Sequence, residues 1–299
     1  MSDPRHFIDG TELTRADLGT LIERAVELKS AGPAGPRPLR DRSIALLFEK
    51  PSTRTRVSFQ VGISQLGGNV LLLRSEELQL ARGESVKDTA LVLSRYIDAI
   101  ACRVGEHALL EELAEHASVP VVNALTPLHH PCQALADLLT LRERFGRTEG
   151  LRVAYVGDGN NVCHSLMLLG ARAGVEVVAA TPAELRPDAA IVAEAGDLAR
   201  VVEDPAAAAA GAHALYTDVW VSMGDESDSR PRRELLEPYR LDAGLLARAR
   251  DDAIVMHCLP AHPGEEITAE LLYGERSAVW DQAENRLHAQ KALLEALLG

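Results

Sequence analysis

The sequence predicts an α/β protein of two domains, each a parallel β-sheet flanked by helices, with an active-site cleft between them. Its 299 residues suffice for two domains of ordinary size. Short apolar runs alternate with segments of helical periodicity along the chain, which is typical of parallel sheets covered on both faces. Polar and charged residues directly follow most of these runs, and in such sheets ligands bind beyond the carboxyl ends of the strands.

The first half is predicted to begin with a helix and then to alternate strand and helix. Thr14 and Asp17 resemble a capping box, leucines at helical spacing follow, and Gly32-Pro33 ends the helix. The expected strands span residues 43–48, 69–73, 99–104 and 119–123, and the expected helices span residues 85–97 and 107–117.

A helix that begins at Pro131 and ends near Gly146 is expected to join the two halves. In the second half we expect strands at 151–156, 175–180, 214–220 and 253–257, with helices at 162–173, 206–210 and 283–298. The polar stretch from Gly224 to Arg233 is predicted to be a loop. The predicted first domain spans residues 1–145, with the C-terminal helix 286–299 packing back on it, and the second spans residues 146–285.

Composition limits the classes of function. A formal net charge of −13 argues against nucleic acid or an anionic membrane as a partner. No apolar run approaches the roughly 18 residues of a membrane span, and the N-terminus lacks the apolar core of a signal peptide. The four cysteines are far apart and form no CxxC pair, so we expect neither a metal site nor a disulfide framework, and we predict a cytoplasmic location. We expect no cofactor.

The stretch Ser52-Thr53-Arg54-Thr55-Arg56 is predicted to bind phosphate. It lies between an apolar run of strand length and a helical window, so its hydroxyls and guanidiniums fall where a helix begins. The first turn of a helix offers unpaired backbone N–H groups and the positive end of the helix dipole, and arginine matches phosphate oxygens. Any one of these residues could instead be a helix cap or a solvated surface group. Five consecutive polar donors after a buried strand favour the phosphate site.

Polar residues gather after the other predicted strands as well. They are Arg103, residues 129–133, residues 157–161, residues 218–224 and residues 257–260. Because the carboxyl ends of parallel strands meet at one edge of a sheet, each half is predicted to carry binding residues at that edge.

In their order along the chain, these segments resemble those of the ornithine carbamoyltransferases, members of the aspartate/ornithine carbamoyltransferase superfamily. The resemblance covers essentially the whole chain. Its motifs are Phe48-x-x-x-Ser52-Thr53-Arg54-Thr55-Arg56-x-Ser58-Phe59, His130-Pro131-Cys132-Gln133, Asp158-Gly159-Asn160-Asn161, Asp218-x-Trp220-x-Ser222-Met223-Gly224 and His257-Cys258-Leu259-Pro260. The Ser-Met-Gly and His-Cys-Leu-Pro segments point to the ornithine branch of the superfamily rather than the aspartate branch.

The resemblance implies an enzyme of arginine metabolism that transfers the carbamoyl group of carbamoyl phosphate to the δ-amino group of L-ornithine, giving L-citrulline and phosphate. It implies that the first domain binds carbamoyl phosphate. The residues implied to bind this substrate are Ser52, Thr53, Arg54, Thr55, Gln79, Arg103, His130, Gln133, Cys258, Leu259 and Arg286. Thr55, Arg103 and His130 are expected to donate to the carbonyl oxygen as it becomes an oxyanion, a kind of electrostatic stabilisation that is often the largest contribution to catalysis.

By the same resemblance, the second domain binds ornithine. The residues implied to bind it are Asn161, Asp218, Ser222 and Met223, and those implied to be catalytic are Arg103, His130, Cys258 and Asp218. The nucleophile must be the neutral amine, whereas a free amine of this kind has a pKa near ~10.4. Cys258 and Asp218 are the candidates for accepting its proton or lowering its pKa, although Cys258 could equally be a small buried apolar residue.

The family forms trimers in which a loop of one subunit reaches the active site of the next. The matching stretch here runs from Glu77 to Ser85, with Gln79 as the expected contact. The resemblance therefore implies a homotrimer or a higher multiple of trimers.

Three other functions are compatible with parts of the sequence. A nicotinamide-dependent enzyme is disfavoured because Val162 stands where the third glycine of GxGxxG would fall. A non-catalytic amino-acid-binding protein would have broken phosphate or oxyanion motifs, and these are complete. A carbamoyltransferase acting on putrescine or an acetylated ornithine is disfavoured by the complete Ser222-Met223-Gly224 segment.

Overall fold

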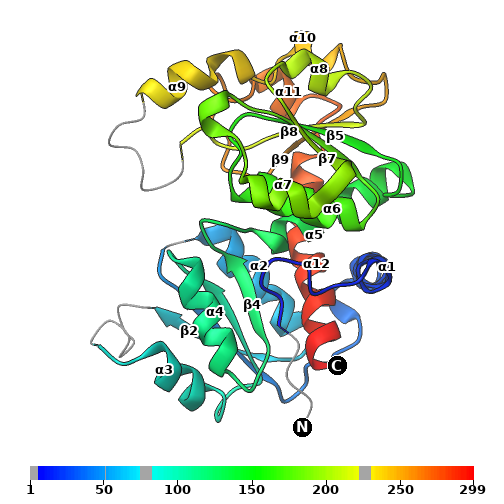
Figure 1. Ribbon diagram of the computed structural model, residues 1–299. Helices are drawn as coiled ribbons and strands as arrows, with labels where there is room; N and C mark the ends of the chain where they lie inside the picture. Colours follow the sequence, from blue (N-terminus) through cyan, green and yellow to red (C-terminus); the bar gives the residue numbers. More distant parts are fainter. Residues whose placement is uncertain (1–5, 51, 75–82, 222–229) are drawn as a thin grey trace. The chain divides into compact units, whose positions relative to one another are not determined.

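The computed structural model describes residues 6–50, 52–74, 83–221 and 230–299 (Figure 1). The chain divides into two compact units, one of Met1–Leu139 with Asn285–Gly299 and one of Thr140–Glu284. The sequence placed the first boundary after residue 145 and the returning segment at residue 286. Two helices, α5 (Pro131–Phe145) and α12 (Val279–Leu298), begin in one unit and end in the other.

The first unit contains a four-stranded parallel sheet. Its strands are β1 (Ser43–Phe48), β2 (Asn69–Arg74), β3 (Ala99–Arg103) and β4 (Val121–Leu125), in the order β2-β1-β3-β4. β1 reads as one continuous apolar run because five of its six residues are buried, as expected for a strand covered on both faces. Phe48 pairs with Arg103, so β1 and β3 end level with each other.

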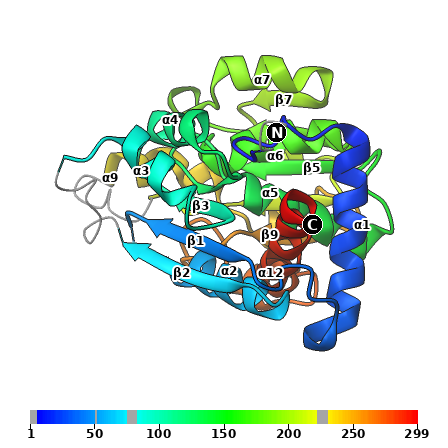
Figure 2. The same ribbon diagram turned by 90° about the horizontal axis from the view of Figure 1, so that it is seen from below.

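Helices cover both faces of this sheet. Their bounds are α1 (Arg15–Ala31), α2 (Thr53–Gln65), α3 (Val86–Leu93) and α4 (His107–His116). Figure 2 shows α3 and α4 on one face, and α2 and α12 on the other. A Cβ added to Gly62 of α2 would lie 3.3 Å from the Leu287 side chain, so α2 and α12 pack closely. The capping box predicted at Thr14 and Asp17 is present and starts α1.

The second unit contains a five-stranded parallel sheet. Its strands are β5 (Arg152–Val156), β6 (Glu176–Ala180), β7 (Ala199–Val202), β8 (Ala214–Thr217) and β9 (Ile254–His257), in the order β7-β6-β5-β8-β9. The chain adds strands on one side of β5 and then on the other, so the order reverses between β5 and β8. In open α/β sheets ligands bind at such a switch point, beyond the carboxyl ends of the strands.

The helices of the second unit lie on both faces of its sheet. Figure 1 shows α6 (Asn161–Arg172) and α7 (Ala189–Ala195) on one face, and α8 (Pro205–Ala209), α10 (Ala243–Leu246) and α11 (Ala269–Tyr273) on the other. A further helix, α9 (Arg230–Leu236), precedes α10. Within the described ranges, no helix is both long and apolar enough to cross a membrane.

Some expectations for the second unit were wrong in detail. The strand expected to reach Trp220 ends at Thr217. The Asp218 carboxylate accepts the Val219 N–H at 2.8 Å, so this N–H does not bond to a neighbouring strand. The stretch from Gly224 to Arg233 was expected to be a loop, but Arg230 to Arg233 belong to α9. Pro231 lies in the first turn of this helix, where proline is tolerated, and the following Arg, Glu and Leu residues favour helix.

Candidate active site

Most predicted binding residues of the first unit lie at or near the carboxyl edge of its sheet. Ser52 occupies the N-cap position of α2 with an extended backbone (φ −151°, ψ 103°), and its side chain makes no capping hydrogen bond. The first turn of α2 therefore keeps backbone N–H groups that are not capped by this hydroxyl, which is the arrangement that favours anion binding.

Arg286 of α12 is the centre of the first cluster, which comprises Thr55, His130, Gln133 and Arg286. Its buried guanidinium donates through Nη1 to Gln133 Oε1 at 2.7 Å and through Nη2 to Thr55 Oγ1 at 3.2 Å. Nη1 also lies 3.4 Å from His130 Nε2. Gln133 is fixed in turn, because its amide donates to Asp137 Oδ1 at 2.9 Å. One guanidinium thus connects α2, the start of α5 and α12.

His130 is buried and electrically neutral in this cluster. Burial lowers its pKa well below 6.5, and the positive charges of Arg286 and Arg103 lower the pKa further. A guanidinium has no acceptor atom, so His130 Nε2 acts as the acceptor toward Arg286 and the ring hydrogen lies on Nδ1. His130 can therefore contribute hydrogen bonds at neutral pH, but not the charge of an imidazolium.

The remaining residues of the predicted phosphate stretch are more exposed. Thr53, Arg54 and Arg56 lie on the solvent side of α2. A hollow of about 390 Å³ lies beside them, and Arg54 is not among its lining residues. The hollow is lined by Phe48, Glu49, Lys50, Ser52, Thr53, Arg56, Leu72 and Arg74. Three cations and one carboxylate make this hollow a basic surface within an acidic protein.

The second cluster is formed by Asn160, Asp218 and Cys258 at the carboxyl edge of the second sheet. Thr217 pairs with His257, so Asp218 and Cys258 follow β8 and β9 at the same level. Cys258 Sγ donates to Asp218 Oδ1 at 2.8 Å, and Asn160 Nδ2 donates to Asp218 Oδ2 at 2.8 Å. The carboxylate of Asp218 is buried, and these bonds hold it in one orientation.

Asn160 was not among the binding residues predicted from the sequence, and its neighbour Asn161 stays a predicted ornithine contact. Asn161 is the first residue of α6, whereas Asn160 is its N-cap and accepts the Val162 N–H at 3.0 Å. The Tyr155 hydroxyl donates to the same Asn160 oxygen at 3.1 Å. The sequence feature that could have identified Asn160 is its N-cap position. An Asn that caps a helix through its side-chain oxygen can use its amide nitrogen to contact another group.

Three predicted residues, Gln79, Ser222 and Met223, lie outside the described residues. Cys258 and Leu259, which the resemblance linked to carbamoyl phosphate, belong to the second unit. Of the four free cysteines, only Cys258 is partly exposed. Burial raises the pKa of the Cys132 thiol to about 12 and raises the pKa of Cys102 and Cys163 as well, so these three are inert apolar side chains at neutral pH.

The glycines after β5 have a structural explanation. Gly157 has a φ of 132°, which favours glycine, and a Cβ added to Gly159 would lie 2.2 Å from the Pro187 nitrogen. Gly159 therefore packs against protein backbone, so its presence is explained without a bound dinucleotide. Asp158, between them, forms an ion pair with Arg232. Burial raises the pKa of Asp158, and the Arg232 charge partly offsets this increase.

Two groups of potential metal ligands occur among the described residues. They are Asp218, His257 and Cys258, and His262, Glu265 and Glu266. Cys258 is hydrogen bonded to Asp218, and His257 to Glu266, so polar contacts within the protein already engage four of these six side chains.

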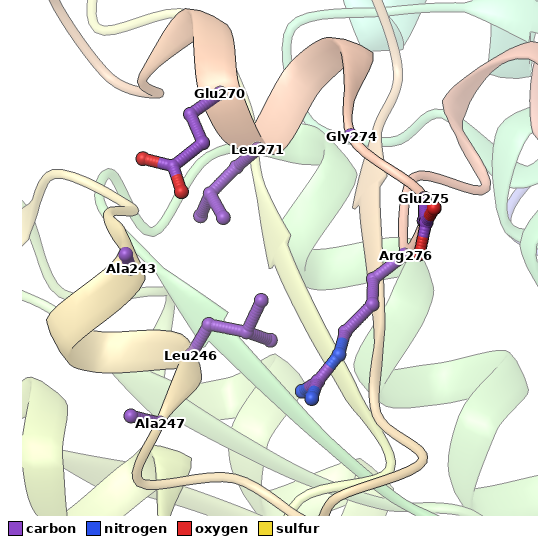
Figure 3. Close-up of a pocket in the computed structure, with 8 residues that line it drawn as sticks. All are labelled: Ala243, Leu246, Ala247, Glu270, Leu271, Gly274, Glu275 and Arg276. Atoms are coloured by element: carbon purple, nitrogen blue, oxygen red, sulfur yellow. The ribbon is translucent and has the colours of Figure 1, made fainter.

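A second hollow, of about 340 Å³, lies in the second unit between α10 and α11 (Figure 3). It is lined by Ala243, Leu246, Ala247, Glu270, Leu271, Gly274, Glu275 and Arg276. None of the residues predicted from the sequence to bind a substrate lines it.

Comparison with known proteins identifies the class. The model of the aspartate/ornithine carbamoyltransferase carbamoyl-P binding domain matches residues 5–143, and that of the Asp/Orn binding domain of the same enzymes matches residues 149–297. The chain therefore belongs to the aspartate/ornithine carbamoyltransferase family.

Individual relatives show to which branch of the family this chain is similar. The chain is 52% identical over 299 residues to an ornithine carbamoyltransferase of Methanoculleus marisnigri, covering 98% of this chain and 97% of that protein. It is 53% identical over 302 residues to an ornithine carbamoyltransferase of Acidothermus cellulolyticus, covering 98% of this chain and 96% of that protein. The solved ornithine carbamoyltransferase of Pyrococcus furiosus matches with a TM-score of 0.95 and 45% identity over 99% of this chain and 98% of that one. Within the family, the chain groups with the ornithine carbamoyltransferases.

Proposed function

We propose that this chain transfers the carbamoyl group of carbamoyl phosphate to the δ-amino group of L-ornithine, giving L-citrulline and phosphate. The observation that carries the proposal is the contact of the Arg286 guanidinium with Thr55, Gln133 and His130. It gathers fixed hydrogen-bonding groups and positive charge next to a helix N-terminus, which suits a phosphorylated substrate with a carbonyl group.

In the first unit, Ser52, Thr53, Arg54 and Thr55 bind the phosphate in this proposal. Arg103, His130, Gln133 and Arg286 surround the carbamoyl group. When an amine attacks the carbamoyl carbon, negative charge grows on the carbonyl oxygen, and cations and N–H groups fixed in advance stabilise it without reorganising. The carbon–oxygen bond to phosphate then breaks, and the phosphate leaves as an anion that the same cations stabilise.

In the second unit, Asp218 binds the α-ammonium group of ornithine in this proposal. Asn161, Ser222 and Met223 are further contacts of its α-amino and α-carboxylate groups. A buried carboxylate suits this role because a cation compensates the cost of its burial. Cys258 and Leu259 lie beside the reacting amine in this proposal. Because Cys258 Sγ donates to Asp218, the sulfur carries its hydrogen, and the Asp218 carboxylate is the stronger acceptor for the amine's proton.

The test is citrulline formation by the purified chain, with ornithine, putrescine, N-acetylornithine and aspartate compared as acceptors at equal concentration. Ornithine should be preferred over each of the others by about 100-fold or more in kcat/KM, because an acceptor that leaves a buried polar group unpaired is strongly rejected. A preference for putrescine or acetylornithine would overturn the acceptor assignment while keeping carbamoyl transfer.

We further propose that the chain acts as a homotrimer, or a higher multiple of trimers, in the cytoplasm. Exposed apolar side chains in the first unit support self-association. Val57 and Val61 of α2, and Leu71 of the edge strand β2, are each between 40% and 46% exposed. Apolar residues exposed together on one part of a surface mark interaction sites. The cytoplasmic location is consistent with the four free cysteines.

Sedimentation equilibrium tests the assembly. The native chain should sediment as a trimer or a multiple of it, and Leu71→Lys should dissociate it, whereas the exposed Leu198→Lys in the second unit should not. A monomeric native chain would contradict the proposal.

A further inference from the structure

A fully buried pair, His257 and Glu266, lies directly beside the second cluster and has no role in the mechanism above. Both side chains are 0% exposed. His257 Nε2 lies 3.0 Å from Glu266 Oε1, and the same oxygen accepts the His262 backbone N–H. A buried carboxylate is costly unless hydrogen bonds or charges compensate it, so a pair in this position needs an explanation.

The hydrogen bonds determine which ring nitrogen of His257 carries the hydrogen. The Leu259 backbone N–H donates to His257 Nδ1 at 2.9 Å. A backbone N–H can only donate, so Nδ1 carries no hydrogen and the ring is neutral with its hydrogen on Nε2. That hydrogen points at the Glu266 carboxylate. The carboxylate therefore selects the tautomer that leaves Nδ1 available as an acceptor, as outer partners of histidines do in other sites.

The Leu259 N–H bond supports an unfavourable backbone conformation. Leu259 has a φ of 60°, a left-handed value that an L-residue adopts only at an energetic cost. On the other side of Cys258, the His257 backbone N–H donates to Gln282 Oε1 at 2.8 Å. The two bonds hold the residues before and after Cys258, whose sulfur contacts Asp218 at 2.8 Å.

We propose that His257 and Glu266 are positioning residues for carbamoyl transfer: Glu266 fixes the His257 tautomer, and His257 Nδ1 holds the turn that presents Cys258 and the Leu259 backbone to the reacting amine. The inference rests on the proposed function, since it assigns these residues a part in that reaction. Neither residue touches a substrate. Both act through the shape of the turn.

Two substitutions of His257 separate this role from simple filling of the core. His257→Asn keeps an acceptor oxygen near the position of Nδ1 but loses the contact with Glu266. His257→Gln keeps a polar group facing Glu266 but loses the acceptor for Leu259. His257→Asn should retain a kcat close to that of the native chain, whereas His257→Gln should lose about 100-fold in kcat, as expected when reacting groups shift by about 1 Å. The KM for carbamoyl phosphate should change little in either variant. The opposite ranking of the two kcat values would overturn the proposal.

Two substitutions of Glu266 supply the second comparison. Glu266→Gln keeps an oxygen that accepts from Nε2–H and should rescue a near-native kcat. Glu266→Leu removes that acceptor and should lower kcat as His257→Gln does, even if its thermal midpoint is unchanged or raised, since apolar replacements of buried ions are often stabilising. Native kcat in Glu266→Leu would show that the carboxylate does not act through the turn.

The tautomer itself can be read without turnover. In the chain labelled with ¹⁵N-histidine, the His257 signals among those of the ten histidines are identified by their loss in His257→Asn. They should show Nδ1 without hydrogen and Nε2 with it, and Glu266→Leu should disturb this pattern. A protonated Nδ1 in the native chain would overturn the proposal. If the tautomer is as expected but the native chain forms no citrulline, the proposed function fails instead.

Discussion

The cluster around Arg286 in the first unit and the cluster around Asp218 in the second have opposite charge. In the first, burial and two arginines lower the pKa of His130 and keep it neutral. In the second, burial raises the pKa of Tyr155 and Asp158, and the nearby carboxylate of Asp218 raises both further. Each unit therefore has its own local field, although the chain as a whole has a net charge of −13.

This difference indicates how one chain can bind both a phosphorylated substrate and an amino acid that carries ammonium groups. Arginines whose hydrogen bonds are made in advance attract an anion, and a buried carboxylate held by an amide and a thiol attracts a cation. The two clusters also have different origins in the sequence. Thr55 and Arg286 come from distant segments, whereas Asp218 and Cys258 follow neighbouring strands of one sheet.

The largest effect is expected at Arg286. Arg286→Met removes the guanidinium from Thr55, Gln133 and His130 and should lower kcat by about 10²- to 10³-fold, as loss of one preorganised donor does in other enzymes. Steady-state kinetics with carbamoyl phosphate as the varied substrate measures it. Arg42→Ala, which removes a half-exposed ion pair with Asp98 in the same unit, serves as the control and should stay near native. Equal loss in both variants would mean that the effect is not specific to the cluster.

A smaller and selective effect is expected at Asp218. Asp218→Asn should raise the ornithine KM by roughly 10- to 100-fold, because hydrogen bonds to charged groups contribute about 1.5–3 kcal/mol, and it should also lower kcat, because the proposed acceptor of the amine's proton is lost. Binding of carbamoyl phosphate, measured by calorimetry, should be unchanged. Asp252→Asn, at an exposed ion pair with Arg250, is the matched control. If Asp218→Asn weakened the binding of both substrates equally, the assignment of opposite local charges to the two units would be contradicted.

The third effect concerns the N-cap beside Asp218. Asn160→Ala removes the contact with Asp218 and the cap of α6, so it should lower the free energy of unfolding by about 1 kcal/mol and raise the ornithine KM severalfold. Asp204→Ala removes the cap of α8 in the same unit. It should cost similar stability and leave the KM unchanged. An unchanged ornithine KM in Asn160→Ala would show that Asn160 serves only as a helix cap.

The smallest effect is a pH dependence of stability from His130. Its pKa is lowered in the folded chain, so below pH 6.5 the unfolded chain takes up this proton first. The free energy of unfolding should therefore fall with decreasing pH from this point, by at most about 1.4 kcal/mol per pH unit for this group. His130→Asn should show a shallower fall of the urea midpoint between pH 6.5 and 5.5, and the same slope as the native chain between pH 7.5 and 8.5. Identical slopes in the acidic range would contradict the neutral buried state of His130.

The strands that could be predicted are those buried on both faces. The run from Ser43 to Phe48 was placed with its observed limits, because only a covered parallel strand explains such a continuous apolar stretch. The edge strand β7 was missed, since it has only four residues and the exposed Arg200 interrupts its apolar pattern. Helix α12 was expected to begin at Ala283 and begins at Val279, because the apolar residues at its start carry no helical period of their own.

Members of the two clusters could be predicted where a residue type and its place after a strand suffice. Asp218, His130 and Gln133 follow that rule, and the structure gives each of them polar contacts in one of the two clusters. Glu266 could not be found in this way. It contacts His257 from nine positions further along the chain, through an irregular segment that no periodicity describes. Outer partners of this kind depend on packing, which a single sequence does not display.

Helix α12 contributes Gln282 to the second unit and Arg286 to the first. During translation, residues 1–139 therefore leave the ribosome long before the arginine that completes their cluster. At about 5–20 residues per second, the delay while the second unit is made is about 7–30 s. When the four strands of the first unit have been made, Arg286 has not, and Gln282 follows nearly all other residues of the second unit. The first cluster is therefore completed only when α12 has been made, whereas Asn160, Asp218 and Cys258 of the second cluster all precede that helix.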